Sequence, residues 1–250
     1  MKKDVLFRIK SLHSLKILFS FFVLLIIPRY SAGQTLIAIK AGINWTNFRD
    51  VENKKTLYGT ASYGFGLDIK GRKPKPIHIG ASIEFLRNSF HWETTSHSGL
   101  GDTKPNGQNI HYAVEWLRLS IYPEIAFGKR FQVNFHFSPY VGIKLHSSKD
   151  GISWTTNDQY QKIIHNVSGS AKDDFVTVDI GFQENLGFGF AVLPYLVLSL
   201  EENYCFGITS VNKVTNGSLK TRSLSVFFCT SFIIPPSKSK EKKKSDDTPN

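Results

Sequence analysis

Alternation of apolar and polar residues with a period of two is the feature of this sequence that most restricts its fold. From Phe131 to Leu145, every second residue is apolar, and the positions between them are mostly polar or small. Successive side chains of a β-strand point to opposite faces, so this pattern predicts a strand with one apolar and one polar face. At 15 residues it is long for a soluble sheet, where about five or six are typical, and it suits a tilted strand that crosses a membrane.

Seven further segments alternate in the same way, which gives eight expected strands. The eight segments are residues 37–45, 62–69, 77–85, 117–127, 131–145, 176–190, 196–206 and 223–232. Their apolar phase is dense in Phe, Leu and Ile, as a lipid-facing wall requires, and their polar phase holds Gly, Ser and charges of both signs, as a narrow interior requires. We therefore expect an all-β fold: an eight-stranded antiparallel up-and-down transmembrane β-barrel.

The lengths of the connections favour this barrel over a soluble sandwich or lipocalin. The connections lie at 49–60, 70–76, 91–111, 128–130, 148–174, 193–194 and 209–220, so long and short ones alternate. In an outer-membrane barrel with a periplasmic N-terminus, the odd connections are long surface loops and the even ones are tight turns. We therefore expect the cell outer membrane, with both termini periplasmic and long hydrated loops over 91–111 and 148–174.

The barrel accounts for residues 34–234, and the flanking segments have other expected roles. Residues 1–33 combine basic residues, an apolar run and small residues before Gln34, which predicts a removed signal peptide, with a retained anchor as the alternative. Residues 235–250 are rich in Pro, Ser, Lys and Asp, which predicts a disordered basic periplasmic tail. These flanks carry +5 and +2 of the formal charge of +11, so we expect no nucleic-acid partner.

Several strands carry the motifs of a known family. The run from Ile39 to Phe48, the acidic Ile83–Leu86, the glycine-rich Leu186–Phe190, and Leu198–Glu201 followed by Tyr204 and Gly207 resemble the Bacteroidetes outer membrane protein beta-barrel domain family, which is PorT-like. The likeness spans about residues 34–234. Trp116-Leu117-Arg118 departs from it, because an apolar and often proline-containing stretch is common there, and the basic tail is extra. The resemblance implies an eight-stranded outer-membrane barrel, and some relatives are linked to protein secretion and gliding machinery.

Charged residues of both signs occupy the phase that is expected to face the interior. A charge inside a narrow barrel must be paired, so these residues predict a salt-bridge network that fills the lumen, with a proton or ion path as the alternative. An eight-stranded barrel has barely enough space for its own side chains, which argues against a pore. The expected network consists of Lys40, Asp68, Glu84, Arg118, Glu124, Lys144, Asp179 and Glu201.

Two glutamates and two cysteines stand apart from this pattern. Glu184 and Glu202 break the lipid-facing phase. Counting residues from the turn at 193–194 places both glutamates about 20 Å above that turn, near the outer interface of the membrane. A carboxylate at that interface costs little free energy. They mark either bulges and headgroup contacts or a protein-contact patch on the wall. Cys205 and Cys229 share the inward phase of adjacent strands, either as a disulfide or as two buried thiols.

The sequence shows no nucleophile motif, phosphate loop or metal-ligand spacing, so we expect no catalytic, cofactor or metal site. The expected protein is a non-enzymatic, monomeric outer-membrane barrel with a structural or interaction role, or a component of a secretion-type envelope assembly. Its expected partners are outer-membrane lipid and an envelope protein. A lipid-modifying outer-membrane enzyme and a soluble lipocalin-like carrier are the alternatives.

Overall fold

Ten strands account for most of the described chain. The computed structural model describes residues 34–50, 56–57, 59–72, 77–97, 105–159, 161–212 and 219–235, so the predicted signal peptide (1–33) and nearly all of the predicted tail (235–250) lie outside the described residues. The strands are β1 (Gln34–Asp50), β2 (Thr56–Leu57), β3 (Gly59–Arg72), β4 (Ile77–His97), β5 (Pro105–Phe127), β6 (Phe131–Thr156), β7 (Lys162–Ser170), β8 (Val178–Leu193), β9 (Leu196–Gly207) and β10 (Leu219–Ile234).

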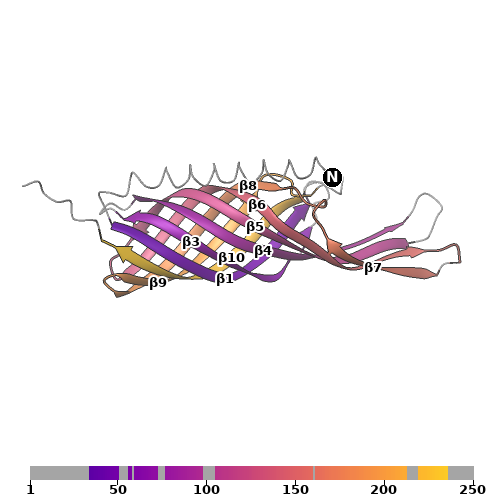
Figure 1. The fold of residues 1–250 in the computed structure, drawn as a ribbon, viewed down its shortest axis with the longest axis horizontal. Helices are drawn as coiled ribbons and strands as arrows, with labels where there is room; N and C mark the ends of the chain where they lie inside the picture. Colours follow the sequence, from indigo (N-terminus) through magenta and orange to yellow (C-terminus); the bar gives the residue numbers. More distant parts are fainter. Residues whose placement is uncertain are drawn as a thin grey trace, which may run out of the picture.

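Eight of these strands close into a barrel. Antiparallel neighbours follow in the order β1, β3, β4, β5, β6, β8, β9 and β10, and β10 pairs back onto β1 (Figure 1). Paired residues followed around the ring from Ala38 return to β1 at Phe48, a stagger of ten residues. Closure with such a stagger tilts the strands by about 40° and leaves an interior that side chains can fill. The predicted eight-stranded antiparallel up-and-down barrel is confirmed.

The barrel has a polar interior and an apolar exterior, the reverse of a soluble protein. The largest exposed side chains form an apolar belt around the outside, bordered by aromatic residues: Phe127, Phe131 and Tyr195 at one end, and Trp45 and Tyr63 at the other. The belt itself consists of Ile39, Ile43, Phe65, Leu67, Ile79, Ile121, Ile125, Phe135, Phe137, Val141, Val178, Ile180, Leu186, Phe188, Leu200, Ile208, Leu224, Phe228 and Phe232. We call the end with the short connections 73–76, 128–130 and 194–195 the turn end, and the other end the mouth.

The barrel sheet continues beyond the mouth as an extension, which consists of the outer ends of β4, β5 and β6 together with β7. The β4–β5 pairing runs on to His97 and Pro105, and β6 pairs with β7 from Ser148–Ser170 to Thr156–Lys162. Figure 1 shows β7 standing clear of the barrel. The expectation of long hydrated loops over 91–111 and 148–174 is therefore wrong for most of these residues. Their sequence is polar at nearly every position, so no apolar phase revealed the strands.

An apolar cluster, the mouth core, closes the barrel at the base of the extension. Two segments, 171–176 and 208–212, cross the mouth, and the amide of Val176 donates to the carbonyl of Val211. The buried members of the mouth core are Phe48, Phe90, Ile110, Tyr112, Val114, Trp116, Ala171, Phe175, Val211 and Leu219. Within the described part of the chain, no helix has the length and apolar character needed to span a membrane.

Candidate functional site

Lys40 and two carboxylates form the first charge cluster of the lumen. The Lys40 ammonium lies 3.0 Å from Asp68 Oδ1 and 2.5 Å from Glu84 Oε1, and all three side chains are buried. Gly66 provides room for them, because a Cβ there would lie 2.9 Å from Lys40 Cε and 3.2 Å from Glu84 Cγ. These three predicted interior residues therefore lie together inside the barrel.

A second cluster centres on Lys70. Its ammonium lies 2.6 Å from Glu124 Oε2 and 3.5 Å from Glu201 Oε1. Two amides connect the clusters: Asn185 donates to Glu201 Oε2 and to the Asn203 side chain, and Asn203 donates to Glu84. The lumen is thus crossed by one continuous set of charged and amide groups, which together leave little free space.

Arg118 and Asp179 lie closer to the mouth but do not pair directly. The Arg118 guanidinium stacks 4.2 Å from the centre of the Tyr140 ring, and its Nη1 lies 2.8 Å from Cys205 Sγ. The Tyr140 hydroxyl donates to Asp179 Oδ2 at 3.0 Å. Among the described residues Arg118 forms no ion pair within 4.0 Å, and Tyr140 contacts both of these members of the predicted network.

Lys144 is not part of the lumen network, contrary to the prediction. The register between β5 and β6 shifts between Glu115 and Trp116, and this shift places Lys144 opposite Trp116 at the edge of the mouth. The Lys144 ammonium donates to the carbonyls of Lys172 and Phe175, both at 2.6 Å. Lys144 therefore binds the segment that crosses the mouth to the barrel wall.

The two cysteines are buried free thiols, so the disulfide alternative is wrong. Cys205 pairs with Ser223 and Cys229 pairs with Ser199, which separates the thiols along β9 and β10.

Glu184 and Glu202 are exposed on the outer wall, as their phase implies. They occupy diagonal positions on β8 and β9, because Glu202 pairs with Leu186 and Glu184 pairs with Tyr204. The belt continues past them in both directions: toward the mouth with Val178, Ile180 and Ile208, and toward the turn end with Leu186, Phe188 and Leu200. The carboxylates therefore interrupt the apolar belt, with exposed apolar residues on both sides of them along the strands.

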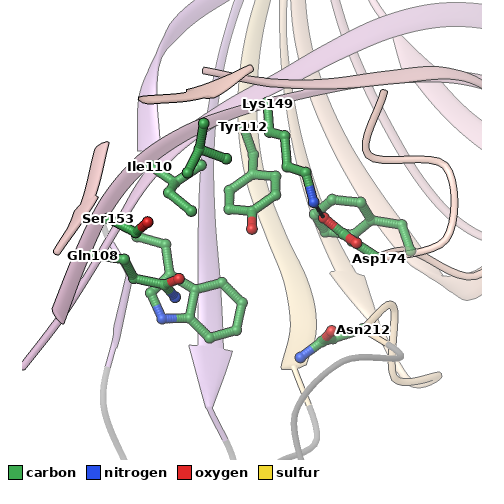
Figure 2. A pocket seen from close by; sticks show the side chains of 10 residues that line it. Gln108, Ile110, Tyr112, Lys149, Ser153, Asp174 and Asn212 are labelled. Atoms are coloured by element: carbon green, nitrogen blue, oxygen red, sulfur yellow. Dashed lines mark hydrogen bonds and ion pairs between the residues drawn. The ribbon is translucent and has the colours of Figure 1, made fainter. Parts of the chain in front are cut away.

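A pocket opens above the mouth core, on the inner side of the extension. It has a volume of about 260 Å³ and is lined from β4, β5, β6, β7 and the crossing segments. Figure 2 shows Gln108, Tyr112 and Asn212 around the same opening, with Lys149 and Asp174 at its side. Lys149 and Asp174 form an ion pair at 2.8 Å. No group of three or more His, Cys, Asp or Glu side chains in the described ranges is arranged to hold a metal ion.

Comparison with known proteins finds similarity in structure but not in sequence. No protein-family model and no curated protein matches the chain. Among solved structures, Ail, the attachment invasion locus protein of Yersinia pestis, is 10% identical over 79% of this chain and 99% of its own, with a TM-score of 0.39. Neisserial surface protein A is 10% identical over 77% and 95%, with a TM-score of 0.39. The outer membrane protein AlkL is 12% identical over 84% and 94%, with a TM-score of 0.37.

These similarities are too weak to support an assignment of function. The fold class rests on the closed ring of paired strands in this chain itself. Membership of the PorT-like family stays a prediction.

Sequence analysis missed Lys70 and the mouth pocket. Residues 70–76 are assigned to a turn by their Gly and Pro content, which removed Lys70 from the interior phase. The signal was present, because Lys70 continues the alternation that places Asp68 inside. The pocket draws residues from several segments that pair only in the folded chain, so no local pattern indicates it.

Proposed function

We propose that this protein is a non-enzymatic, monomeric outer-membrane barrel that presents the extension on the cell surface. The observation that carries the proposal is an apolar belt around a lumen filled with ion pairs. Such an exterior needs lipid contact, and such an interior leaves no room for a substrate path. The long extension at the mouth and the short connections at the turn end support an orientation with both termini in the periplasm.

Cell fractionation and gel mobility test this proposal. We expect the protein in the outer-membrane fraction, extracted only by detergent, with unheated and boiled samples migrating differently in SDS gels. Protease added to intact cells should cleave the turn at residues 157–159, at the tip of the extension, and leave the barrel intact. Recovery of a soluble protein without detergent, as for a lipocalin-like carrier, would contradict it.

We further propose that the role is one of interaction, as a component of a secretion-type envelope assembly. The extension supports it, because among the described strands β7 pairs only with β6, is exposed along its length, and carries the exposed side chains of Ile163 and Ile164. An unpaired strand edge of this kind can accept a strand from another protein. The acidic wall pair Glu184 and Glu202 is a second contact patch in this proposal.

Cross-linking and purification from membranes test the wall patch. The double variant Glu184→Leu/Glu202→Leu should keep the heat-modifiable barrel and lose its stable complex with an envelope protein. Glu93→Leu, an exposed glutamate on the extension, is the matched control and should keep the complex. A complex that survives the double substitution would remove the wall patch from the proposal, and hydrolysis of outer-membrane lipid by the purified protein would contradict the non-enzymatic role.

A further inference from the structure

The pocket above the mouth core is lined by three aromatic rings at angles to one another. The Trp92 and Tyr112 rings lie 6.2 Å apart at 53°, and the Tyr112 and Phe175 rings lie 5.4 Å apart at 82°. Phe175 and Tyr112 are fixed in the mouth core, whereas Trp92 is only partly buried. The rings therefore form a rigid apolar wall with one accessible indole, and the volume of about 260 Å³ fits one or two small rings.

The remaining lining groups offer both donors and acceptors. The amides of Gln108 and Asn212 each carry both kinds of group, and Ser153 adds a hydroxyl. Figure 2 shows the Tyr112 hydroxyl directed toward the space between Gln108 and Asn212. Burial and the nearby Asp174 carboxylate raise the pKa of Tyr112 to about 12, so this hydroxyl keeps its proton at neutral pH.

The charges in the pocket largely cancel. Lys149 Nζ lies 2.8 Å from Asp174 Oδ2, so neither offers a free charge to an ionic ligand. A hydrocarbon ligand would displace water from the amides and the ion pair without replacing its hydrogen bonds. Such desolvation costs free energy. The lining therefore disfavours both anions and hydrocarbon chains.

We propose that the pocket binds a neutral saccharide of one or two rings. A sugar ring has an apolar C–H face that packs on an indole, and hydroxyls that both donate and accept hydrogen bonds. The geometry assigns the stacking surface to Trp92 and the hydroxyl contacts to Gln108 and Tyr112. The inference rests on the proposed function in one respect only: the proposed orientation places the pocket on the cell surface, and so decides on which side of the membrane the sugar would be bound.

The four tryptophans of the chain allow a direct test on the full-length protein. Trp45 borders the apolar belt, Trp116 lies in the mouth core, Trp154 lies on β6 outside the pocket, and Trp92 lines it. The protein is labelled with 5-fluorotryptophan and kept in LDAO micelles, because maltoside detergents carry a competing sugar. Maltose, lactose, cellobiose and N,N′-diacetylchitobiose are titrated while the four fluorine resonances are recorded.

We expect at least one of these disaccharides to shift the Trp92 resonance saturably, with a Kd of roughly a millimolar, as is usual for a small polar ligand. Trp92→Ala should weaken binding of the sugar at least tenfold. Saturation-transfer NMR of the sugar measures binding in this variant. Gln108→Leu keeps the size of the side chain but removes its amide. It should weaken binding of the sugar to the same extent while all the aromatic rings stay in place. Trp154→Ala is the matched control and should bind as the wild type does, since Trp154 instead packs 4.2 Å from Lys162.

Each variant is first checked for a heat-modifiable band, so that misfolding is not mistaken for lost binding. A glycolipid that carries the same sugar, supplied in nanodiscs, is the second arm. Tighter binding there identifies a lipid-linked sugar as the source, and equal binding identifies a free one. The proposal is overturned if no probe shifts Trp92, if Gln108→Leu binds normally, or if glucose 6-phosphate binds more tightly than the neutral sugars. Because purified protein is used, these outcomes are independent of the fractionation result.

Discussion

At the scale of single residues, the two lumen lysines supply the lysine partner of the ion pairs that four buried carboxylates form. Lys40→Met should therefore leave Asp68 and Glu84 uncompensated in a dry interior. Breaking a buried ion pair by removing one partner costs about 3–5 kcal/mol, because the remaining charge stays buried. We expect this loss in the free energy of unfolding, measured by urea titration of the barrel in lipid vesicles.

A second substitution distinguishes lost charge balance from lost packing. Adding Glu84→Gln to Lys40→Met removes one of the two uncompensated carboxylate charges and should recover part of the lost stability. Adding Glu124→Gln, which belongs to the Lys70 cluster, should recover none. Equal effects of the two second substitutions would mean that the lumen responds to total charge instead of to these pairs.

The acidic pair on the wall leads to the opposite expectation. Near the middle of a bilayer, a lipid-facing Lys or Arg costs about 2–4 kcal/mol and a glutamate costs less. Glu184→Leu and Glu202→Leu should therefore each stabilise the isolated barrel in vesicles by about 1 kcal/mol. The same urea titration measures it, with Glu93→Leu, outside the belt, expected to change nothing. A destabilised double variant would show that these carboxylates make contacts within the barrel wall.

At the scale of elements, the alternation of side chains predicted the barrel strands but not their ends. Seven of the eight expected segments lie within barrel strands, and the eighth, 176–190, starts two residues before β8, because each has an apolar phase that faces outward. The extension was missed because both of its faces are polar: β7 reads Lys-Ile-Ile-His-Asn-Val-Ser-Gly-Ser, without a period of two. Its strands depend on pairing with neighbours, and pairing leaves no trace in the composition of a single segment.

Long-range register set the other limits. Lys144 has the correct phase for the lumen, yet the irregular register beside it moves it to the mouth, where it donates to two backbone carbonyls. The heights of Glu184 and Glu202 depend on the stagger of the whole ring, which no single strand encodes. The sequence thus predicts which side of the wall a residue faces better than how high on the wall it lies.

The β4–β5 hairpin of the extension should respond to pH. The His91 and His111 rings lie 4.8 Å apart, with Arg87 nearby on the same face. Burial, followed by the His91 and Arg87 charges, lowers the pKa of His111 below its usual value. The folded hairpin therefore binds fewer protons than the unfolded one, so its stability should fall as pH drops through the usual histidine pKa of about 6.5.

Hydrogen exchange of the hairpin amides at pH 7.5 and pH 5 measures this effect. We expect faster opening at the lower pH in the wild type, and a smaller difference in His111→Gln, which cannot take up the proton. His165→Gln, on β7, is the control and should behave as the wild type does. The same acid response in His111→Gln would assign it to another group.

At the scale of the whole molecule, two separate layers fill the channel that the barrel would otherwise enclose. The ion pairs and amides occupy the middle of the lumen, and the mouth core lies above them under the crossing segments. Either layer alone is enough to block ions, because an eight-stranded barrel has no spare interior width. Relaxing one layer should therefore leave the other in place.

Planar bilayer recordings check this two-layer arrangement. We expect no resolvable single-channel conductance from the wild type, and none from Phe90→Ala/Phe175→Ala, which thins only the mouth core. Tyr122 is a fully buried lumen ring whose centre lies 5.9 Å from Lys70 Nζ. Tyr122→Ala should also stay silent, because the mouth core still covers the lumen. Combining all three substitutions removes bulk from both layers, so it is the variant in which brief conducting events are expected. Channel activity in the wild type would mean that the charged lumen serves as an ion path rather than as packing.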